Sequence, residues 1–169
     1  MYKPLRKEIV SVLVLNQANV LTRVVSNFGR RGFNIDSLTV SATNDPDLSR
    51  ITIVFNATEQ SMQQIITQTE KLEVVKSIFI LNRENSLYRE LLLLKVNATE
   101  KERTSIKEIV DIYRGKIVDL SRESMIIELT GTPEKIDGFM EVISAHDVVE
   151  VCRTGITGIE SNARNAKKN

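Results

Sequence analysis

Apolar and polar residues follow one another along the chain in segments that predict a repeated order of strands and helices. Residues 9–15 are rich in β-branched side chains and too few for a helix, which predicts a buried central strand. Residues 20–28 carry apolar side chains at helical spacing, and an extended pattern resumes over 34–40. A turn at 44–47, a strand at 50–55, a helix after Thr58 and a strand at 74–81 complete the first half. Its order is therefore strand, helix, strand, strand, helix, strand.

The second half repeats this order after a polar break at residues 82–86. Thr99 and Glu102 have the spacing of a capping box for a helix that Gly115 ends. Thr132 followed by Pro133 predicts the start of a second helix. The predicted strands cover residues 91–96, 116–120, 125–129 and 148–151, before a loop at 153–158. We expect one domain over residues 1–82, another over 83–160, and a disordered tail over 161–169.

The fold class that follows is α+β, with two tandem ferredoxin-like βαββαβ domains. Right-handed crossovers give each domain a four-stranded antiparallel sheet with two helices on one face. The other face of each sheet has no helix to cover it. A second domain or a second copy must bury it, so we expect a homodimer.

The junction between the first strand and the first helix is the candidate binding site. The first N–H groups of this helix, around Val20 and Leu21, have no partner within the helix and suit a carboxylate. Asn16, just before the junction, offers a carbonyl oxygen for an ammonium group, so the loop could hold both ends of a free amino acid. Asn19 stands at the N-cap position. The alternative is that Asn16 and Asn19 only turn and cap the chain.

Composition excludes several classes of partner. The 169 residues are 41% hydrophobic and carry a net charge of +1, so no overall field attracts nucleic acid or an anionic membrane. The polar start and the lack of a long apolar stretch predict a cytoplasmic protein without a membrane segment. One cysteine, Cys152, and one histidine, His146, predict neither an internal disulfide nor a zinc site, and both are interpreted as structural.

Enzyme and RNA-binding functions on the same fold find little support. No glycine-rich nucleotide motif or nucleophile-elbow motif is present. An acylphosphatase-like enzyme needs an arginine in the loop after the first strand, and residues 16–19 contain none. An RNA-recognition module needs aromatic residues on its central strands, where Phe55 stands alone.

Several segments together resemble one known family. They are residues 11–16, 21–24, 31–40, 45–52, 89–91, 113–119 and 150–155, and the resemblance extends over about residues 8–158. The family is the small regulatory subunit of acetolactate synthase. The resemblance implies that the first half is an ACT domain, a ligand-sensing module that pairs side by side with its copy. In this family valine binds between the two copies. The resemblance places Asn16 of one subunit and Asn34 of the other on the amino acid, with the N–H groups around Val20 and Leu21 on its carboxylate.

Asn19 departs from the family pattern, which usually has glycine in this loop. Glycine allows a close approach of backbone and ligand, whereas an asparagine adds bulk and can cap the helix with its own oxygen. Because the same N–H groups cannot serve a cap and a ligand, we expect valine binding to be weakened or altered.

The resemblance also implies a non-catalytic role in branched-chain amino acid biosynthesis. The second half would help to hold the dimer and would activate the large catalytic subunit, which carries thiamine diphosphate, magnesium and FAD; this chain would carry no cofactor. Feedback inhibition by valine would act through the first half. The alternative is a stand-alone ACT-type amino-acid sensor that regulates another enzyme.

Overall fold

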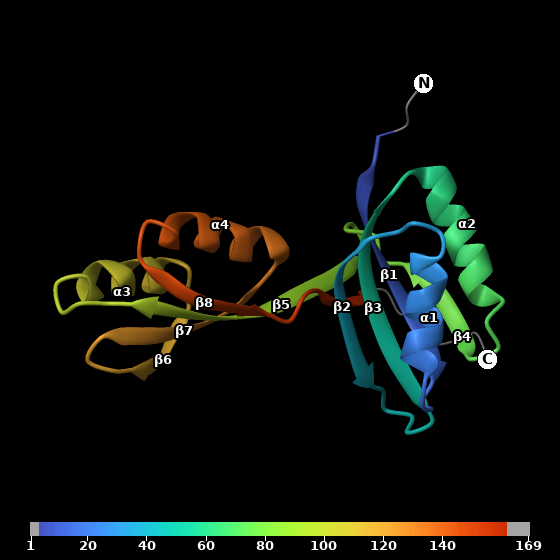
Figure 1. Cartoon of the computed structure of the whole chain (residues 1–169), viewed down its shortest axis with the longest axis horizontal. Helices are drawn as coiled ribbons and strands as arrows, with labels where there is room; N and C mark the ends of the chain where they lie inside the picture. The colour runs from blue at the N-terminus through green and yellow to red at the C-terminus, as the bar shows by residue number, and fades with distance from the viewer. Residues whose placement is uncertain (1–3, 162–169) are drawn as a thin grey trace. The chain divides into compact units, whose positions relative to one another are not determined.

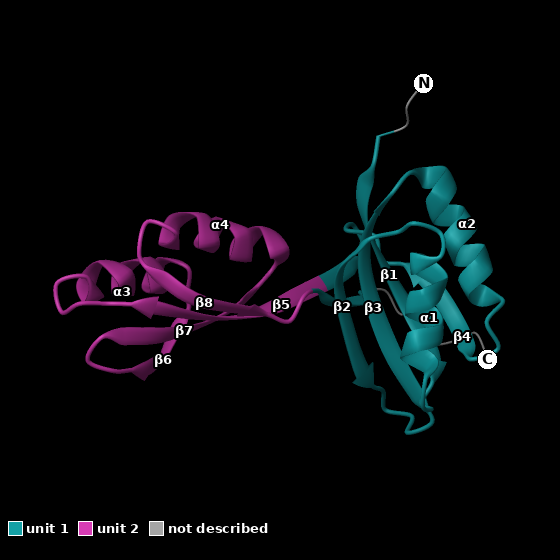
Figure 2. Ribbon diagram, in the orientation of Figure 1, with its two compact units in different colours: residues 1–87, 156–169 teal, residues 88–155 magenta. Residues whose placement is uncertain are grey.

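The computed structural model describes residues 4–161. Contacts between Cα atoms divide them into two compact units, one made of residues up to 87 together with those from 156, the other of residues 88–155 (Figure 2). The tail predicted to be disordered lies, apart from Ser161, outside the described residues. Among the described residues, no helix has the length and apolar character needed to cross a membrane.

The first unit is an antiparallel sheet of four strands in the order β2-β3-β1-β4. Figure 1 shows α1 and α2 on one face of this sheet. The central strand β1 is buried because β3 and β4 flank it and the helices cover it, as its β-branched run predicts. The elements are β1 (Arg6–Leu15), α1 (Val20–Gly29), β2 (Ile35–Ala42), β3 (Leu48–Ala57), α2 (Glu59–Glu70) and β4 (Val75–Ile80).

Three phenylalanines fix the end of α1 against the sheet. Phe28 and Phe55 are fully buried, with ring centroids 5.1 Å apart in an edge-to-face arrangement. Phe33 folds back onto both, 6.2 Å from Phe28 and 5.4 Å from Phe55. Gly32 permits this reversal because its φ of 77° lies in the left-handed region. The three rings therefore hold the C-terminal end of α1 against β3.

A second unit repeats the arrangement with the strand order β6-β7-β5-β8 (Figure 1). Its helices α3 and α4 cover one sheet face, and the core lies between the two layers. The two tandem ferredoxin-like βαββαβ domains predicted from the sequence are therefore confirmed. The elements are β5 (Ser86–Asn97), α3 (Arg103–Ile112), β6 (Lys116–Leu120), β7 (Ser124–Gly131), α4 (Pro133–Ile143) and β8 (Val148–Arg153).

Two details at the ends of α3 differ from the prediction. The Glu102 carboxylate does accept the Thr99 N–H at 3.0 Å, but the Thr99 hydroxyl donates to the same carboxylate at 2.6 Å. Only half of the predicted capping box forms, because this hydroxyl is turned to the carboxylate. At the other end the left-handed residue is Arg114, with φ 56°, and not Gly115. Gly115 lies in a tight space, since an added Cβ would lie 3.2 Å from the Glu128 carbonyl oxygen.

The structure contains a further strand, β9 (Thr157–Glu160), which begins within the segment predicted as a loop. It pairs with β5 and is followed by Ser161, whose N–H donates to the Asn85 carbonyl at 2.7 Å. Just before it, Ile156 is 2% exposed and its carbonyl accepts the Thr39 hydroxyl at 3.1 Å. The segment before β9 therefore contacts β2 of the first unit, through the hydrogen bond between Thr39 and Ile156.

Candidate functional site

The loop between β1 and α1 is held by the turn that joins β2 to β3. The Asn16 backbone N–H donates to the Asp47 carbonyl at 2.7 Å. The Asn16 side-chain Nδ2 donates to the Pro46 carbonyl at 3.0 Å, and its Oδ1 accepts the Ser49 hydroxyl at 3.1 Å. A carbonyl can only accept, so the Pro46 contact fixes which end of the amide is nitrogen. Asn16 is exposed, and its Oδ1 keeps one lone pair for a further donor such as an ammonium group.

Asn19 occupies the N-cap position of α1 but does not cap it with its side chain. Its backbone is left-handed, with φ 64°, and its carbonyl accepts the Arg23 N–H at 3.1 Å. The expected side-chain cap is therefore wrong, and so is the expected competition for the helix N–H groups. Glycine adopts this left-handed φ without strain, and asparagine tolerates it better than most other residues.

The first turn of α1 presents unsatisfied N–H groups beside this loop. Val20 is 4% exposed and anchors the helix to the core, whereas Leu21 is 39% exposed and faces outward. Within the described residues no side chain accepts from the N–H groups of Val20 and Leu21, and α1 has no acidic residue in its first turn. These N–H groups can therefore donate to an anion at the positive end of the helix.

Asn34 lies at the opposite end of the sheet from Asn16. It is exposed and directly precedes β2, whose first residue Ile35 is opposite Phe55 near the end of β3. Asn16 follows Leu15, which is opposite Leu48 at the start of β3. Seven residues of β3 separate these registers, a distance of about 23 Å at ~3.3 Å per residue. The structure thus brings together Asn16, Asn19, Val20 and Leu21, and it places Asn34 of the same chain apart from them.

Near the C-terminal end of α1, a buried polar network joins this helix to α2, and sequence reasoning missed it. Asn27 is 3% exposed, and its Nδ2 donates to the Thr69 hydroxyl at 2.9 Å. Thr69 is fully buried and donates in turn to the Ile65 carbonyl at 2.7 Å. The Arg31 guanidinium donates to the Asn27 side-chain oxygen and, at 3.2 Å, to Gln68. The available signal was a lone amide on the apolar stripe of α1, between buried Val24 and Phe28.

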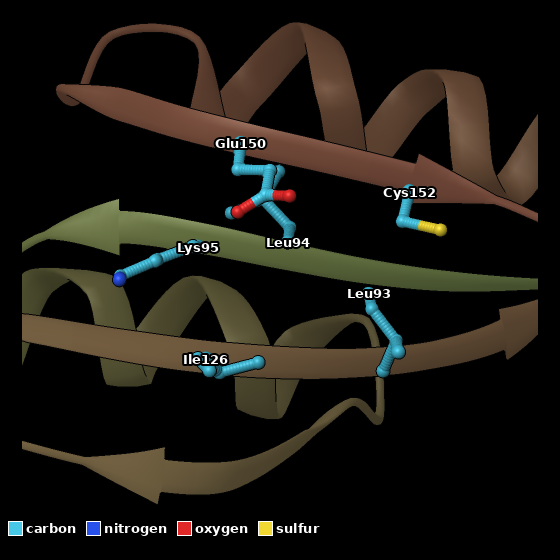
Figure 3. A pocket seen from close by; sticks show the side chains of 6 residues that line it. All are labelled: Leu93, Leu94, Lys95, Ile126, Glu150 and Cys152. Carbon is cyan, nitrogen blue, oxygen red and sulfur yellow. The ribbon is translucent and has the colours of Figure 1, made fainter.

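A separate hollow of about 250 Å³ lies on the face of the second sheet that is opposite its helices (Figure 3). Leu93 and Ile126 give it apolar walls, and Lys95 pairs in register with Glu150 across β5 and β8. Cys152 lies beside them as an exposed free thiol. Opposite charges and apolar side chains alternate on this face, a pattern that suits contact with another protein surface.

Comparison with known proteins decides the family. Residues 10–77 match a model described as the AHAS small subunit-like ACT domain, and residues 89–162 match one described as the small subunit of acetolactate synthase. The acetolactate synthase small subunit of Mycolicibacterium smegmatis is 43% identical over 92% of this chain and 91% of its own length. The chain belongs to the acetolactate synthase small subunit family. It is thus a regulatory subunit, and catalysis lies in the large subunit.

Further relatives agree with this assignment. A probable acetolactate synthase small subunit of Archaeoglobus fulgidus is 44% identical over 88% of this chain and 93% of its own length. A crystal structure of the small subunit from Thermotoga maritima superposes with a TM-score of 0.85, at 38% identity, over 92% of this chain and 97% of that one. The resemblance inferred from the sequence motifs is confirmed, and membership of the family implies a large catalytic subunit as partner.

Proposed function

We propose that this regulatory subunit binds valine at an interface between two copies of its first unit, and that the bound amino acid lowers activation of the large subunit. The observation that carries the proposal is the separation of Asn16 and Asn34 within one chain. Because about 23 Å lies between their registers along β3, one small amino acid can contact both only if they come from different copies.

The edge position of β2 supports a dimer that meets this requirement. β2 is the first strand of the order β2-β3-β1-β4, so its outer side pairs with no other strand of that sheet. If it pairs antiparallel with its own copy, the start of one β2 lies beside the end of the other. The end of β2 pairs with the start of β3. The start of β3 also pairs with the end of β1, which Asn16 directly follows. The partner's start of β2, with its Asn34, would therefore reach the same end of the combined sheet.

The groups around that position match a zwitterionic aliphatic amino acid. The N–H groups of Val20 and Leu21 would take the carboxylate at the positive end of α1. The free lone pair of Asn16 Oδ1 would take the ammonium group, with Asn34 of the other copy completing the contacts. The exposed Leu21 side chain offers apolar contact to an aliphatic side chain. Asn19 still adds bulk that glycine lacks, so Asn19→Gly is expected to tighten valine binding; an unchanged Kd would show that the side chain does not crowd the ligand.

The second unit, in this proposal, helps to hold the dimer through its open sheet face and activates the catalytic subunit. That face carries the self-complementary mixture of Leu93, Ile126, Lys95 and Glu150. Thiamine diphosphate, magnesium and FAD would be bound by the large subunit. We place the complex in the cytoplasm, where a free thiol such as that of Cys152 stays reduced.

A calorimetric titration of the full chain with valine, leucine and isoleucine tests the binding. Asn16→Ala and Asn34→Ala should each abolish measurable heat. If each site combines Asn16 of one copy with Asn34 of the other, an equimolar mixture of the two variants regains about a quarter of the sites, since half of the dimers are mixed and each has one intact site. A mixture as inactive as its components would contradict a shared site.

The alternative, a stand-alone amino-acid sensor, makes a different prediction. It requires that the purified large subunit have the same activity with and without this chain. A rise in acetolactate production on addition of the chain, reduced again by valine, supports the proposed function. Valine must then bind more tightly to the less activating arrangement of the complex, because coupling between two sites is reciprocal.

A further inference from the structure

The outer face of α1 carries a basic hollow that shares only Asn19 with the proposed valine site. Its volume is about 390 Å³, and Leu72, after α2, provides an apolar wall. The remaining lining residues stand at positions i, i+3, i+4, i+7 and i+11, which places them on one face of α1 and its caps. They are Asn19, Thr22, Arg23, Ser26 and Arg30.

Neighbouring arginines on this helix have different roles. Arg31 is committed to the fold, because its guanidinium donates to Asn27 and Gln68. Arg23 and Arg30 are exposed, and among the described residues neither forms an ion pair or a side-chain hydrogen bond. In the part of the chain that the structure describes, Glu70 and Glu73, near Leu72 in the sequence, are exposed and form no ion pair with Arg23 or Arg30. The hollow thus presents two free guanidinium groups together with the hydroxyl groups of Thr22 and Ser26.

We propose that this basic face of α1 docks an acidic segment of the large catalytic subunit. The inference rests on the proposed function, in which that subunit is the partner. Guanidinium groups bind carboxylates through two parallel hydrogen bonds, and two of them at a fixed spacing define a register. Two isolated arginines on a chain of net charge +1 are too few for a nucleic acid, whose binding depends on many phosphate contacts.

The spacing of the arginines specifies the segment that fits. Arg23 and Arg30 are seven residues apart, or about 10.5 Å along the helix axis at ~1.5 Å per residue. A partner helix matches this distance with carboxylates seven positions apart, which lie two turns from each other on nearly the same face. The Ser26 hydroxyl lies between the arginines along the helix and the Thr22 hydroxyl lies next to Arg23, and both can bond polar groups of the segment. Leu72 offers contact to one aliphatic side chain of the segment.

Asn19 connects this surface to the valine site. It lines the hollow and also precedes the N–H groups proposed for the valine carboxylate. A ligand that shifts the first turn of α1 therefore shifts one wall of the docking surface. Valine and the acidic segment would then influence each other through a single helix.

The double charge reversal Arg23→Glu with Arg30→Glu tests the surface. Activation of the large subunit is measured as a function of small-subunit concentration, and valine binding to the isolated variant is measured by calorimetry. We expect the half-saturating concentration to rise at least tenfold while the Kd for valine stays within twofold. The matched control is Arg122→Glu, an exposed arginine in a turn of the second unit. Equal half-saturating concentrations for wild type and double variant would overturn the docking surface, whereas a wild-type chain that does not activate at all would overturn the proposed function.

The conservative double variant Arg23→Lys with Arg30→Lys identifies the occupant. A carbodiimide condenses a lysine amine with a carboxylate to an amide, and the carbodiimide takes up the water that is lost. We expect a cross-link from residue 23 or 30 to an acidic segment of the large subunit, found by mass spectrometry of the complex. A cross-link only between two small subunits would overturn the proposal by showing that a second copy covers the face.

Discussion

The hydrogen bond between Asn27 and Thr69 makes a sharp prediction about what holds α1 in place. Thr69→Val keeps the shape of the side chain and removes only the hydroxyl that accepts from Asn27 Nδ2 at 2.9 Å. Asn27 cannot turn its amide over to compensate, because its oxygen already accepts from Arg31. Since Asn27 is 3% exposed, its Nδ2 is left without water or a partner.

The expected cost follows from that burial. A buried donor that loses its acceptor costs about 1–3 kcal/mol, and each kcal/mol lowers Tm by about 2–4 °C in a chain of this size. The matched control is Thr67→Val on the same helix, where the exposed hydroxyl donates only to the Gln63 carbonyl at 2.9 Å. Thr69 makes the equivalent bond to Ile65, so the difference between the variants isolates the loss of Asn27's partner.

The measurement is urea denaturation of the full chain followed by circular dichroism, with both variants and wild type at the same protein concentration. We expect Thr67→Val to lie within about 0.5 kcal/mol of wild type and Thr69→Val to be less stable by about 1–3 kcal/mol. Two variants of equal stability would refute the reasoning, because they would show that the Asn27 amide is satisfied without Thr69.

Three further predictions concern single positions. Asn19→Ala should cost about 1 kcal/mol and Asn19→Gly should be nearly neutral in the same denaturation assay, since alanine is strained at φ 64° and glycine is not. Gly115→Ala should lower the stability by about 1–2 kcal/mol, because its Cβ would lie 3.2 Å from the Glu128 carbonyl oxygen; an unchanged midpoint would show that the backbone can shift. Hydrogen bonds from the Thr99 side chain and backbone lower the pKa of Glu102 below its ordinary value of 4.5. The stability that these bonds add to the folded state is therefore present above about pH 4.5 and is lost as the pH falls through the lowered pKa. Thr99→Ala should therefore raise that pKa in an NMR titration of the carboxyl group, and an unmoved titration curve would contradict the assignment.

The fold could be predicted because its elements have local causes. The β-branched residues of β1, the apolar stripes of the helices and the Thr132–Pro133 start of α4 each act within a few residues. β9 could not be predicted in the same way, because it is four residues long and pairs with a strand far back in the chain. A short strand of this kind is defined by its partner and not by its own pattern.

The candidate site could be predicted only in part, for a similar reason. The position of the helix N-terminus followed from the sequence, but Asn16 is oriented by Pro46 and Ser49, about thirty residues away. Asn19 shows a second limit. Asparagine favours both a side-chain N-cap and the left-handed conformation, and sequence alone does not choose between them. In the structure Asn19 adopts the left-handed conformation and its side chain does not cap α1, so the N–H groups of the first turn can bind a ligand.

The inner side, the N-terminus and the outer side of α1 together give a physical basis for regulation by this subunit. Its inner side is hydrogen-bonded to α2 through Asn27, Thr69 and Arg31, which links the positions of the two helices. In our proposals its N-terminus binds the valine carboxylate and its outer side contacts the catalytic subunit. A ligand shifts an equilibrium only by its difference in affinity for two arrangements. Loosening the link between the helices with Thr69→Val should therefore weaken the effect of valine on activation more than it weakens valine binding itself, because a helix that moves alone transmits less to the surface beside Leu72. Equal losses in both would place the coupling elsewhere in the chain.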